Sequence, residues 1–174
     1  FEKKMNQVKI KISPKAAFLD RDGVINEDTG YLNNIKDFKW IEGAIEALKI
    51  LKENNFLIII ISNQSGVSRG YFSEQDVHSL HKWINLQLSE HNVKIDDFFF
   101  ATEHPDTETS ETRRKPSPRM IEEAIKKYNL NRDDCFMIGD KDIDVLAAKN
   151  AKIKGFLFEG GNLSYKIKKI LNIA

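Results

Sequence analysis

Five polar residues of this chain stand where they could act together on a phosphate ester. Asp20 and Asp22 follow an apolar run, and Ser62 follows a run of four isoleucines. Lys115 precedes a proline, and Asp140 stands just beyond a third apolar run. One carboxylate can attack phosphorus and another can transfer a proton, while a hydroxyl and an ammonium can hold phosphoryl oxygens. These residue types predict a magnesium-dependent phosphatase.

The acidic residues among them call for a cation. Two like charges about 4 Å apart repel by roughly 4 kcal/mol at an effective dielectric near 20, so Asp20, Asp22 and Asp140 need a divalent metal to stay ionised together. Oxygen ligands favour Mg²⁺. A calcium loop starting at Asp20 would need glycine and glutamate where Ile25 and Tyr31 stand. The glycine patterns of nucleotide cradles are also missing from the sequence.

Composition narrows the possible partners and the location. The 174 residues carry 27 basic and 26 acidic side chains, and the net charge of +1 predicts no nucleic-acid partner. One cysteine, Cys135, indicates a reducing compartment, and no apolar stretch predicts a membrane span. We therefore expect a cytoplasmic monomer without membrane association. Residues 1–15 are interpreted as an N-terminal extension, partly left over from cloning, and residues 16–174 as a single phosphatase domain.

Short apolar runs alternate with segments of helical periodicity. The predicted strands are 16–19, 56–61, 98–100, 136–138 and 153–158. Apolar residues recur at helical spacing over 41–51, 77–88 and 121–128, and two further helices are predicted at about 142–150 and 163–173. Ser73 and the Ser117-Pro118 pair are predicted to start the second and third helices. This order indicates an α/β fold, a Rossmann-like three-layer sandwich with a mostly parallel sheet.

The same order predicts where the polar residues meet. Ligands of open parallel sheets bind beyond the carboxyl ends of the strands, where Asp20, Ser62 and Asp140 are expected to converge. Only about 40 residues separate the first two of these motifs, so no large cap domain is expected. The loops 22–39 and 102–115 are predicted to wall the substrate instead.

The motifs resemble those of the haloacid dehalogenase superfamily of aspartate-nucleophile phosphatases. The matching positions, in chain order, are Asp20-Arg21-Asp22-Gly23, Ser62, Lys115, and Gly139-Asp140-Lys141 with Asp144. The resemblance implies that Asp20 is the nucleophile and Asp22 the general acid and base. It also implies Mg²⁺ held by Asp20, the backbone carbonyl of Asp22 and Asp140, with Ser62 and Lys115 on the phosphoryl oxygens.

Within this superfamily, the stretches 20–26, 28–31, 62–72, 104–105, 114–116 and 139–141 resemble those of the D-glycero-D-manno-heptose-1,7-bisphosphate 7-phosphatases, and the resemblance extends over residues 16–161. That branch implies a small phosphorylated sugar as substrate. The implied substrate contacts are Asp28, Thr29, Gly30, Tyr31, Asn63, Gln64, Ser65, Arg114 and Lys141. A histidinol-phosphate phosphatase or another small sugar-phosphate phosphatase is the alternative. A phospho-ligand sensor without catalysis and a nucleic-acid end phosphatase are less favoured, because both catalytic carboxylates are kept and the charge is near neutral.

One loop departs from that branch. Many members bind zinc there, and the four ligand positions are occupied in this chain by Ala101, Glu103, Glu111 and Arg113. None is cysteine or histidine, so structural zinc is not expected, and the loop is predicted to depend on packing and hydrogen bonds. The nearby helix carries two histidines three residues apart, His78 and His81, which are interpreted as solvent-facing residues rather than metal ligands.

Overall fold

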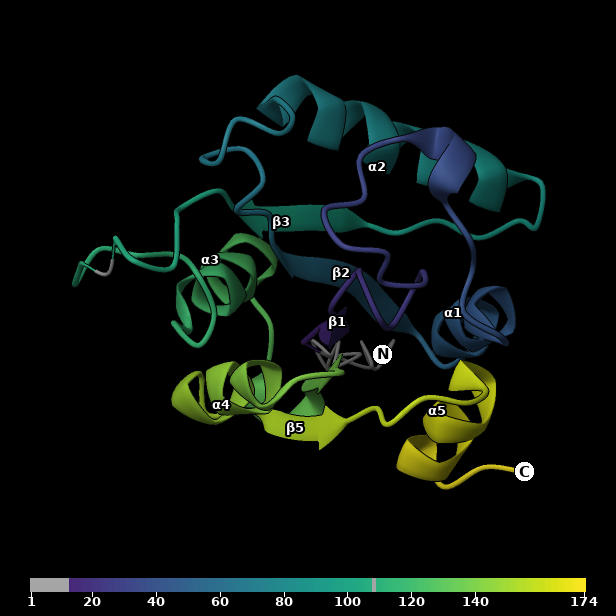
Figure 1. The fold of residues 1–174 in the computed structure, drawn as a ribbon. Helices are drawn as coiled ribbons and strands as arrows, with labels where there is room; N and C mark the ends of the chain where they lie inside the picture. Colours follow the sequence, from purple (N-terminus) through teal and green to yellow (C-terminus); the bar gives the residue numbers. More distant parts are fainter. Residues whose placement is uncertain (1–12, 108) are drawn as a thin grey trace, which may run out of the picture.

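Five parallel strands form the centre of the computed structural model, which describes residues 13–107 and 109–174. They are β1 (Lys15–Leu19), β2 (Phe56–Asn63), β3 (Asp97–Ala101), β4 (Phe136–Gly139) and β5 (Lys154–Leu157). Their order across the sheet is β3-β2-β1-β4-β5 (Figure 1). Every predicted strand is confirmed, with ends displaced by at most two residues. The predicted extension lies outside the described residues, apart from its last three.

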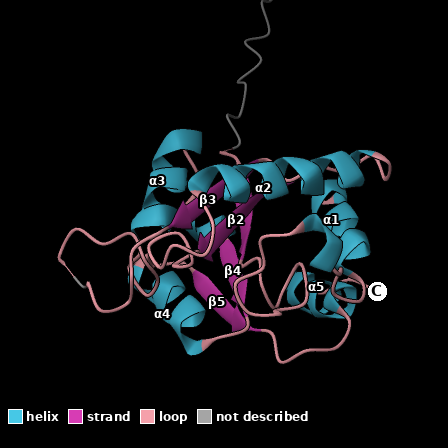
Figure 2. Ribbon diagram, turned by 45° about the horizontal axis from the view of Figure 1, so that its top comes forward, coloured by secondary structure: helices cyan, strands magenta, loops and turns pink. Residues whose placement is uncertain are grey.

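Helices cover both faces of the sheet. They are α1 (Ala44–Glu53), α2 (Glu74–Ser89), α3 (Arg119–Tyr128), α4 (Asp142–Asn150) and α5 (Leu163–Leu171). Helices α1, α2 and α5 lie on one face and α3 and α4 on the other (Figures 1 and 2). The predicted three-layer α/β sandwich is therefore confirmed. No described helix is long and apolar enough to cross a membrane.

The strand sequences explain why both faces are covered. Successive side chains of a strand point to opposite faces, so a continuous apolar run must be buried on both. In β2, Ile58 and Ile60 pack with the α1, α2 and α5 layer, whereas Ile59 and Ile61 pack with α3 and α4. All four isoleucines are fully buried. The sheet that carries the site is thus held from both sides.

The two predicted helix starts have different outcomes. The predicted cap Ser73 is confirmed, because its side chain and that of Asp76 form a reciprocal capping box at the start of α2. Helix α3 begins at Arg119, and its N-cap position is taken by Pro118 instead of Ser117. The amide of Arg119 still donates to the Ser117 hydroxyl over 3.3 Å. Ser117, one residue before the N-cap, therefore provides the hydrogen-bond acceptor for the first amide of this helix.

Removing side-chain volume from the sheet should destabilise the whole fold. Ile60→Ala should lower the free energy of unfolding by about 3 kcal/mol, because Ile60 is fully buried between β1 and the helical layer. Urea unfolding followed by circular dichroism measures this change. Leu86→Ala on the outer face of α2 is the control, since Leu86 is 64% exposed and its loss should cost less than about 0.5 kcal/mol. Equal effects of the two substitutions would contradict this account of the core.

Candidate active site

The carboxyl ends of three strands bring the predicted site residues together. Asp20 follows β1, Ser62 lies near the end of β2, and Asp140 follows β4. The strands are in parallel register, with Leu19 paired to Ile60 on one side and to Ile138 on the other. The Asp20 amide donates to the Ile138 carbonyl, which ties the loop after β1 to β4.

Lys115 lies at the centre of this edge, and its side chain is only 2% exposed. Its ammonium donates to Asp20 Oδ1 at 2.9 Å and to the Ile61 carbonyl at 2.8 Å, and it pairs with Asp144 Oδ1 at 2.7 Å. Burial opposes its charge, but the carboxylates of Asp20 and Asp144 outweigh that effect and raise the pKa of Lys115. The lysine is therefore a permanent buried cation whose three donors all have acceptors.

Asp20 sits in a site that disfavours its charge. Burial raises the pKa of Asp20 to about 7; Lys115 opposes this rise, whereas Asp144 and Asp22 add to it. One lysine shared between two buried carboxylates therefore offsets only part of the cost of burying the Asp20 charge. A second cation at this site would favour the ionised, nucleophilic form.

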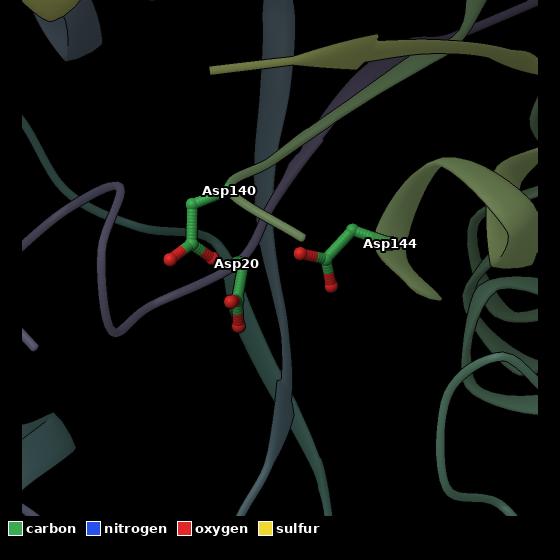
Figure 3. Close-up of side chains that lie close together, drawn as sticks. All are labelled: Asp20, Asp140 and Asp144. Atoms are coloured by element: carbon green, nitrogen blue, oxygen red, sulfur yellow. The ribbon is translucent and has the colours of Figure 1, made fainter. Parts of the chain in front are cut away.

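Three carboxylates offer a place for such a cation. Asp20, Asp140 and Asp144 each present an oxygen, and these oxygens lie within 4.8 Å of one another (Figure 3). Among the residues that the structure describes, Asp140 Oδ1 is buried without a hydrogen-bond partner, while Asp144 is already held by Lys115 and by the Lys141 amide. An all-oxygen set with one unsatisfied buried oxygen fits a hard divalent ion such as Mg²⁺.

Gly23 makes room for this arrangement. Its φ of +89° is a conformation that side chains disfavour, and a Cβ atom there would overlap the Asp140 carboxylate. The glycine that follows the Asp-x-Asp pair therefore lets the β1 loop approach the β4 loop closely. No other residue type would fit without displacing Asp140.

The second carboxylate of the pair is fixed by four hydrogen bonds. Arg21 donates to both oxygens of Asp22, from Nε and Nη2 at 3.1 Å each. Asn26 Nδ2 donates to the same carboxylate at 2.9 Å, and Gln64 Nε2 donates at 3.1 Å. The Asp22 side chain is 18% exposed. It therefore borders the cleft in a defined orientation and remains accessible to a substrate.

Gln64 also orients Ser62. The amide nitrogen of Gln64 donates to Asp22 Oδ2 at 3.1 Å and also to Ser62 Oγ at 2.6 Å. The hydroxyl hydrogen of Ser62 is then free to donate elsewhere. Gln64 thus links the acid to the serine expected on the phosphoryl group.

A cleft of about 280 Å³ opens over these residues. Its walls include these predicted residues: Asp20, Asp22, Asp28, Gly30, Tyr31, Asn63, Gln64, Ser65, Arg114, Lys115 and Lys141. Three predicted residues, Thr29, Ser62 and Asp140, do not line it. Arg69 does line it and was not predicted, although it belongs to the stretch 62–72 that carries the branch resemblance.

Two guanidinium groups face this cleft. Burial lowers the pKa of Arg114, and the nearby charge of Arg69 lowers it further. The Arg69 guanidinium lies 5.7 Å from the ring centroid of Tyr31, which packs edge-on against Tyr71. Among residues 13–107 and 109–174, neither arginine has a carboxylate within ion-pair distance. An anion bound between the two would therefore relieve their repulsion.

Hydrogen bonds hold the loop that follows β3. Arg113 donates twice to Glu123 on α3, at 2.9 and 2.7 Å, and once to the Phe100 carbonyl at 2.9 Å. The Arg113 amide donates to the Glu103 carboxylate at 2.8 Å. Side-chain contacts thus join Arg113, the residue before Arg114, to β3 and α3.

The prediction that His81 faces solvent is wrong. His81 is 4% exposed, and its ring stacks on Phe98 with centroids 4.2 Å apart, whereas His78 is exposed as predicted. The spacing that makes Val77 part of the apolar stripe of α2 also places His81, four residues later, on the same face. The helical period could therefore have identified this buried histidine.

Comparison with known proteins agrees with this geometry. A family model of haloacid dehalogenase-like hydrolases matches residues 15–152. The chain belongs to this family. One similar protein is the D-glycero-beta-D-manno-heptose-1,7-bisphosphate 7-phosphatase of Pasteurella multocida, 42% identical over 144 residues, which are 80% of this chain and 78% of the relative. The D-glycero-alpha-D-manno-heptose-1,7-bisphosphate 7-phosphatase of Photorhabdus laumondii is 42% identical over 154 residues, 85% of this chain and 84% of the relative.

Solved structures support the same family. A HAD-like phosphatase from Mesorhizobium loti superposes with a TM-score of 0.78 at 30% identity, over 85% of this chain and 74% of the other. The D,D-heptose 1,7-bisphosphate phosphatase of B. bronchiseptica, solved with magnesium and phosphate, gives a TM-score of 0.77 at 23% identity. That match covers 92% of this chain and 88% of the other, and at this identity it shows a shared fold.

The contact between Gly23 and Asp140 can be tested through metal binding. Gly23→Ala in this hydrolase should weaken Mg²⁺ binding roughly 10- to 100-fold, because the added methyl group displaces the Asp140 carboxylate. Isothermal titration calorimetry measures the affinity. Gly160→Ala is the matched control, since its φ of +93° is similarly strained but nothing lies within 4 Å of its Cβ position. Equal losses of affinity in both variants would contradict the steric explanation.

Proposed function

We propose that this chain is a magnesium-dependent phosphatase that removes the 7-phosphate of D-glycero-D-manno-heptose 1,7-bisphosphate through an aspartyl-phosphate. The observation that carries the proposal is a single cleft that contains two carboxylates with different contacts. Asp20 pairs with the ammonium of Lys115, whereas Asp22 accepts hydrogen bonds from Arg21 and Gln64. Two guanidiniums on the same cleft suit a second phosphate. Relatives about 40% identical, named for this reaction, support the choice of substrate.

The two carboxylates divide the chemistry between them. Asp22 enters this step protonated: an Asp20 oxygen attacks phosphorus while the bond from phosphorus to the sugar oxygen breaks, and the Asp22 carboxyl gives its proton to that leaving oxygen. Asp22 then takes a proton from a water molecule, which attacks the aspartyl-phosphate and releases inorganic phosphate. Asp20 is regenerated as a carboxylate, so the second step restores the starting state.

The remaining residues neutralise charge. Mg²⁺ held by Asp20, Asp140 and the Asp22 carbonyl would shield the nucleophile from the negative phosphate. The free hydroxyl hydrogen of Ser62 would donate to a phosphoryl oxygen. Lys115 would act on the phosphoryl group as a fixed positive charge, because its three donors already have acceptors.

The sugar end of the substrate would meet the loops. Arg114 would bind the 1-phosphate, since a guanidinium matches two phosphate oxygens at once, and Arg69 would share this anion. Lys141, which lies 3.5 Å from Asp28, would add positive charge on the opposite wall. Among the remaining predicted contacts, Gly30, Tyr31, Asn63 and Ser65 line the cleft and would contact the sugar, whereas Thr29 lies outside the lining and is not assigned a contact.

The arginine pair favours a bisphosphate over histidinol phosphate, the alternative substrate. Histidinol phosphate has one phosphate, which the catalytic carboxylates require, and its amine is cationic at neutral pH. That amine would approach Arg69 and Arg114, two cations that already repel each other. A second phosphate at the same place removes this repulsion, so the bisphosphate should be preferred.

Phosphate release from defined substrates tests the proposed reaction. We expect Mg²⁺-dependent turnover of the α or β anomer of heptose 1,7-bisphosphate and slower turnover of histidinol phosphate. Asp20→Asn should reduce the rate at least about 10³-fold, because no carboxylate remains to attack phosphorus. A colorimetric assay of inorganic phosphate measures all three rates. Inert heptose anomers with a correctly folded protein would overturn the choice of substrate.

The role of Arg114 is separable from the chemistry. Arg114→Ala should raise KM for heptose 1,7-bisphosphate about 10- to 100-fold, because a charge-assisted contact to the second phosphate is lost. KM for heptose 7-phosphate, which lacks that phosphate, should change less than about threefold. Arg119→Ala serves as control, since this exposed arginine pairs with Glu111 outside the cleft. An equal rise for both substrates would exclude a specific contact between Arg114 and the 1-phosphate.

A further inference from the structure

The arginine between the two catalytic aspartates is itself fully buried. Arg21 has no exposed surface, and four of its hydrogen bonds have identified acceptors. Two reach the Asp22 carboxylate, and a third runs from Nη2 to the Leu32 carbonyl at 3.1 Å. The fourth joins Nη1 to His81 Nε2 at 3.2 Å. A buried guanidinium needs such partners, and His81 is the one that comes from a helix.

The contact with Arg21 defines the state of His81. A guanidinium only donates hydrogen bonds, so Nε2 of His81 must accept and the ring proton must lie on Nδ1. Burial and the positive charge of Arg21 lower the pKa of His81 to about 2, in agreement with a neutral ring. The flat stack on Phe98 and an edge contact with Phe100 fix the ring plane. His81 is thus a rigid, neutral acceptor.

We propose that His81 is a positioning residue for the acid step: its Nε2 fixes the guanidinium plane of Arg21, which in turn aims the Asp22 carboxylate at the leaving oxygen. The inference rests on the proposed function, in which Asp22 protonates that oxygen. It extends the site by one helix, because His81 belongs to α2 and has no contact with the cleft itself. Proton transfer depends on geometry, and a displacement of about 1 Å can cost up to about 100-fold in rate.

Two substrates with different leaving groups can show whether His81 positions Asp22 or only packs in the core. A sugar alkoxide needs a proton as it leaves, whereas p-nitrophenolate leaves without one. The ratio kcat/KM reports the steps up to formation of the aspartyl-phosphate, and so does not include the later attack of water. A displaced Asp22 should therefore slow the sugar phosphate selectively. A loosened core should slow both esters alike.

Two substitutions separate the hydrogen bond from the stack. His81→Phe keeps an aromatic ring on Phe98 and removes the acceptor, whereas His81→Gln keeps an acceptor and removes the ring. We expect His81→Phe to lower kcat/KM about 10- to 100-fold for heptose 1,7-bisphosphate and less than about threefold for p-nitrophenyl phosphate. His81→Gln should recover most of the loss. His78→Phe, at the exposed neighbour on α2, is the matched control and should resemble the wild type.

Several outcomes would overturn the inference. Equal losses on both esters, full activity of His81→Phe, or no recovery in His81→Gln would each contradict positioning through the hydrogen bond. Nitrogen-15 NMR gives a test that needs no activity: the His81 ring should be the neutral Nδ1–H tautomer from about pH 5.5 to 8. An Nε2–H tautomer would refute the inference even in an active enzyme. Wild-type protein inert toward both esters would instead overturn the proposed function, and the role of His81 with it.

Discussion

The ammonium of Lys115 between Asp20 and Asp144 is the interaction on which the site depends. It joins the end of β1, the start of α4 and the segment before α3. Removing one partner of such a buried pair costs about 3–5 kcal/mol, because the other charges remain without compensation. The chain thus supplies its acidic centre with a cation of its own, which links three segments of the fold.

The two aspartates of the first motif show how neighbouring residues acquire different tasks. Asp20 lies against a cation and beside other carboxylates, with little access to solvent. Asp22 lies two residues later among four donors from Arg21, Asn26 and Gln64. A group that attacks must keep an oxygen free for phosphorus, whereas a group that transfers protons must hold its direction. The difference between the two environments supports the proposed division of labour.

Much of this arrangement could be predicted from the sequence. Apolar runs located the strands, and the rule that parallel strands end at one edge placed Asp20, Ser62 and Asp140 together. The sequence could not show that Thr29 lies outside the lining of the cleft, because the path of an irregular loop depends on tertiary contacts. His81 was misplaced because a histidine suggests a polar surface, although its position on the stripe of α2 indicates burial. The helical spacing was the better guide to burial than the polarity of histidine, because Arg21 gives the buried ring a hydrogen-bond partner.

The loop that follows β3 and the centre of the site are held by ion pairs that differ in their exposure to solvent. The ion pair of Arg113 and Glu123 is 37% and 43% exposed, whereas the side chains of Lys115, Asp20 and Asp144 are 2%, 9% and 1% exposed. Dissolved ions screen exposed pairs strongly and buried pairs weakly. A higher ionic strength should therefore weaken the ion pair of Arg113, the neighbour of Arg114, more than it weakens the charges buried around Lys115. The two parts of the chain that surround the cleft thus differ in how strongly dissolved salt acts on them.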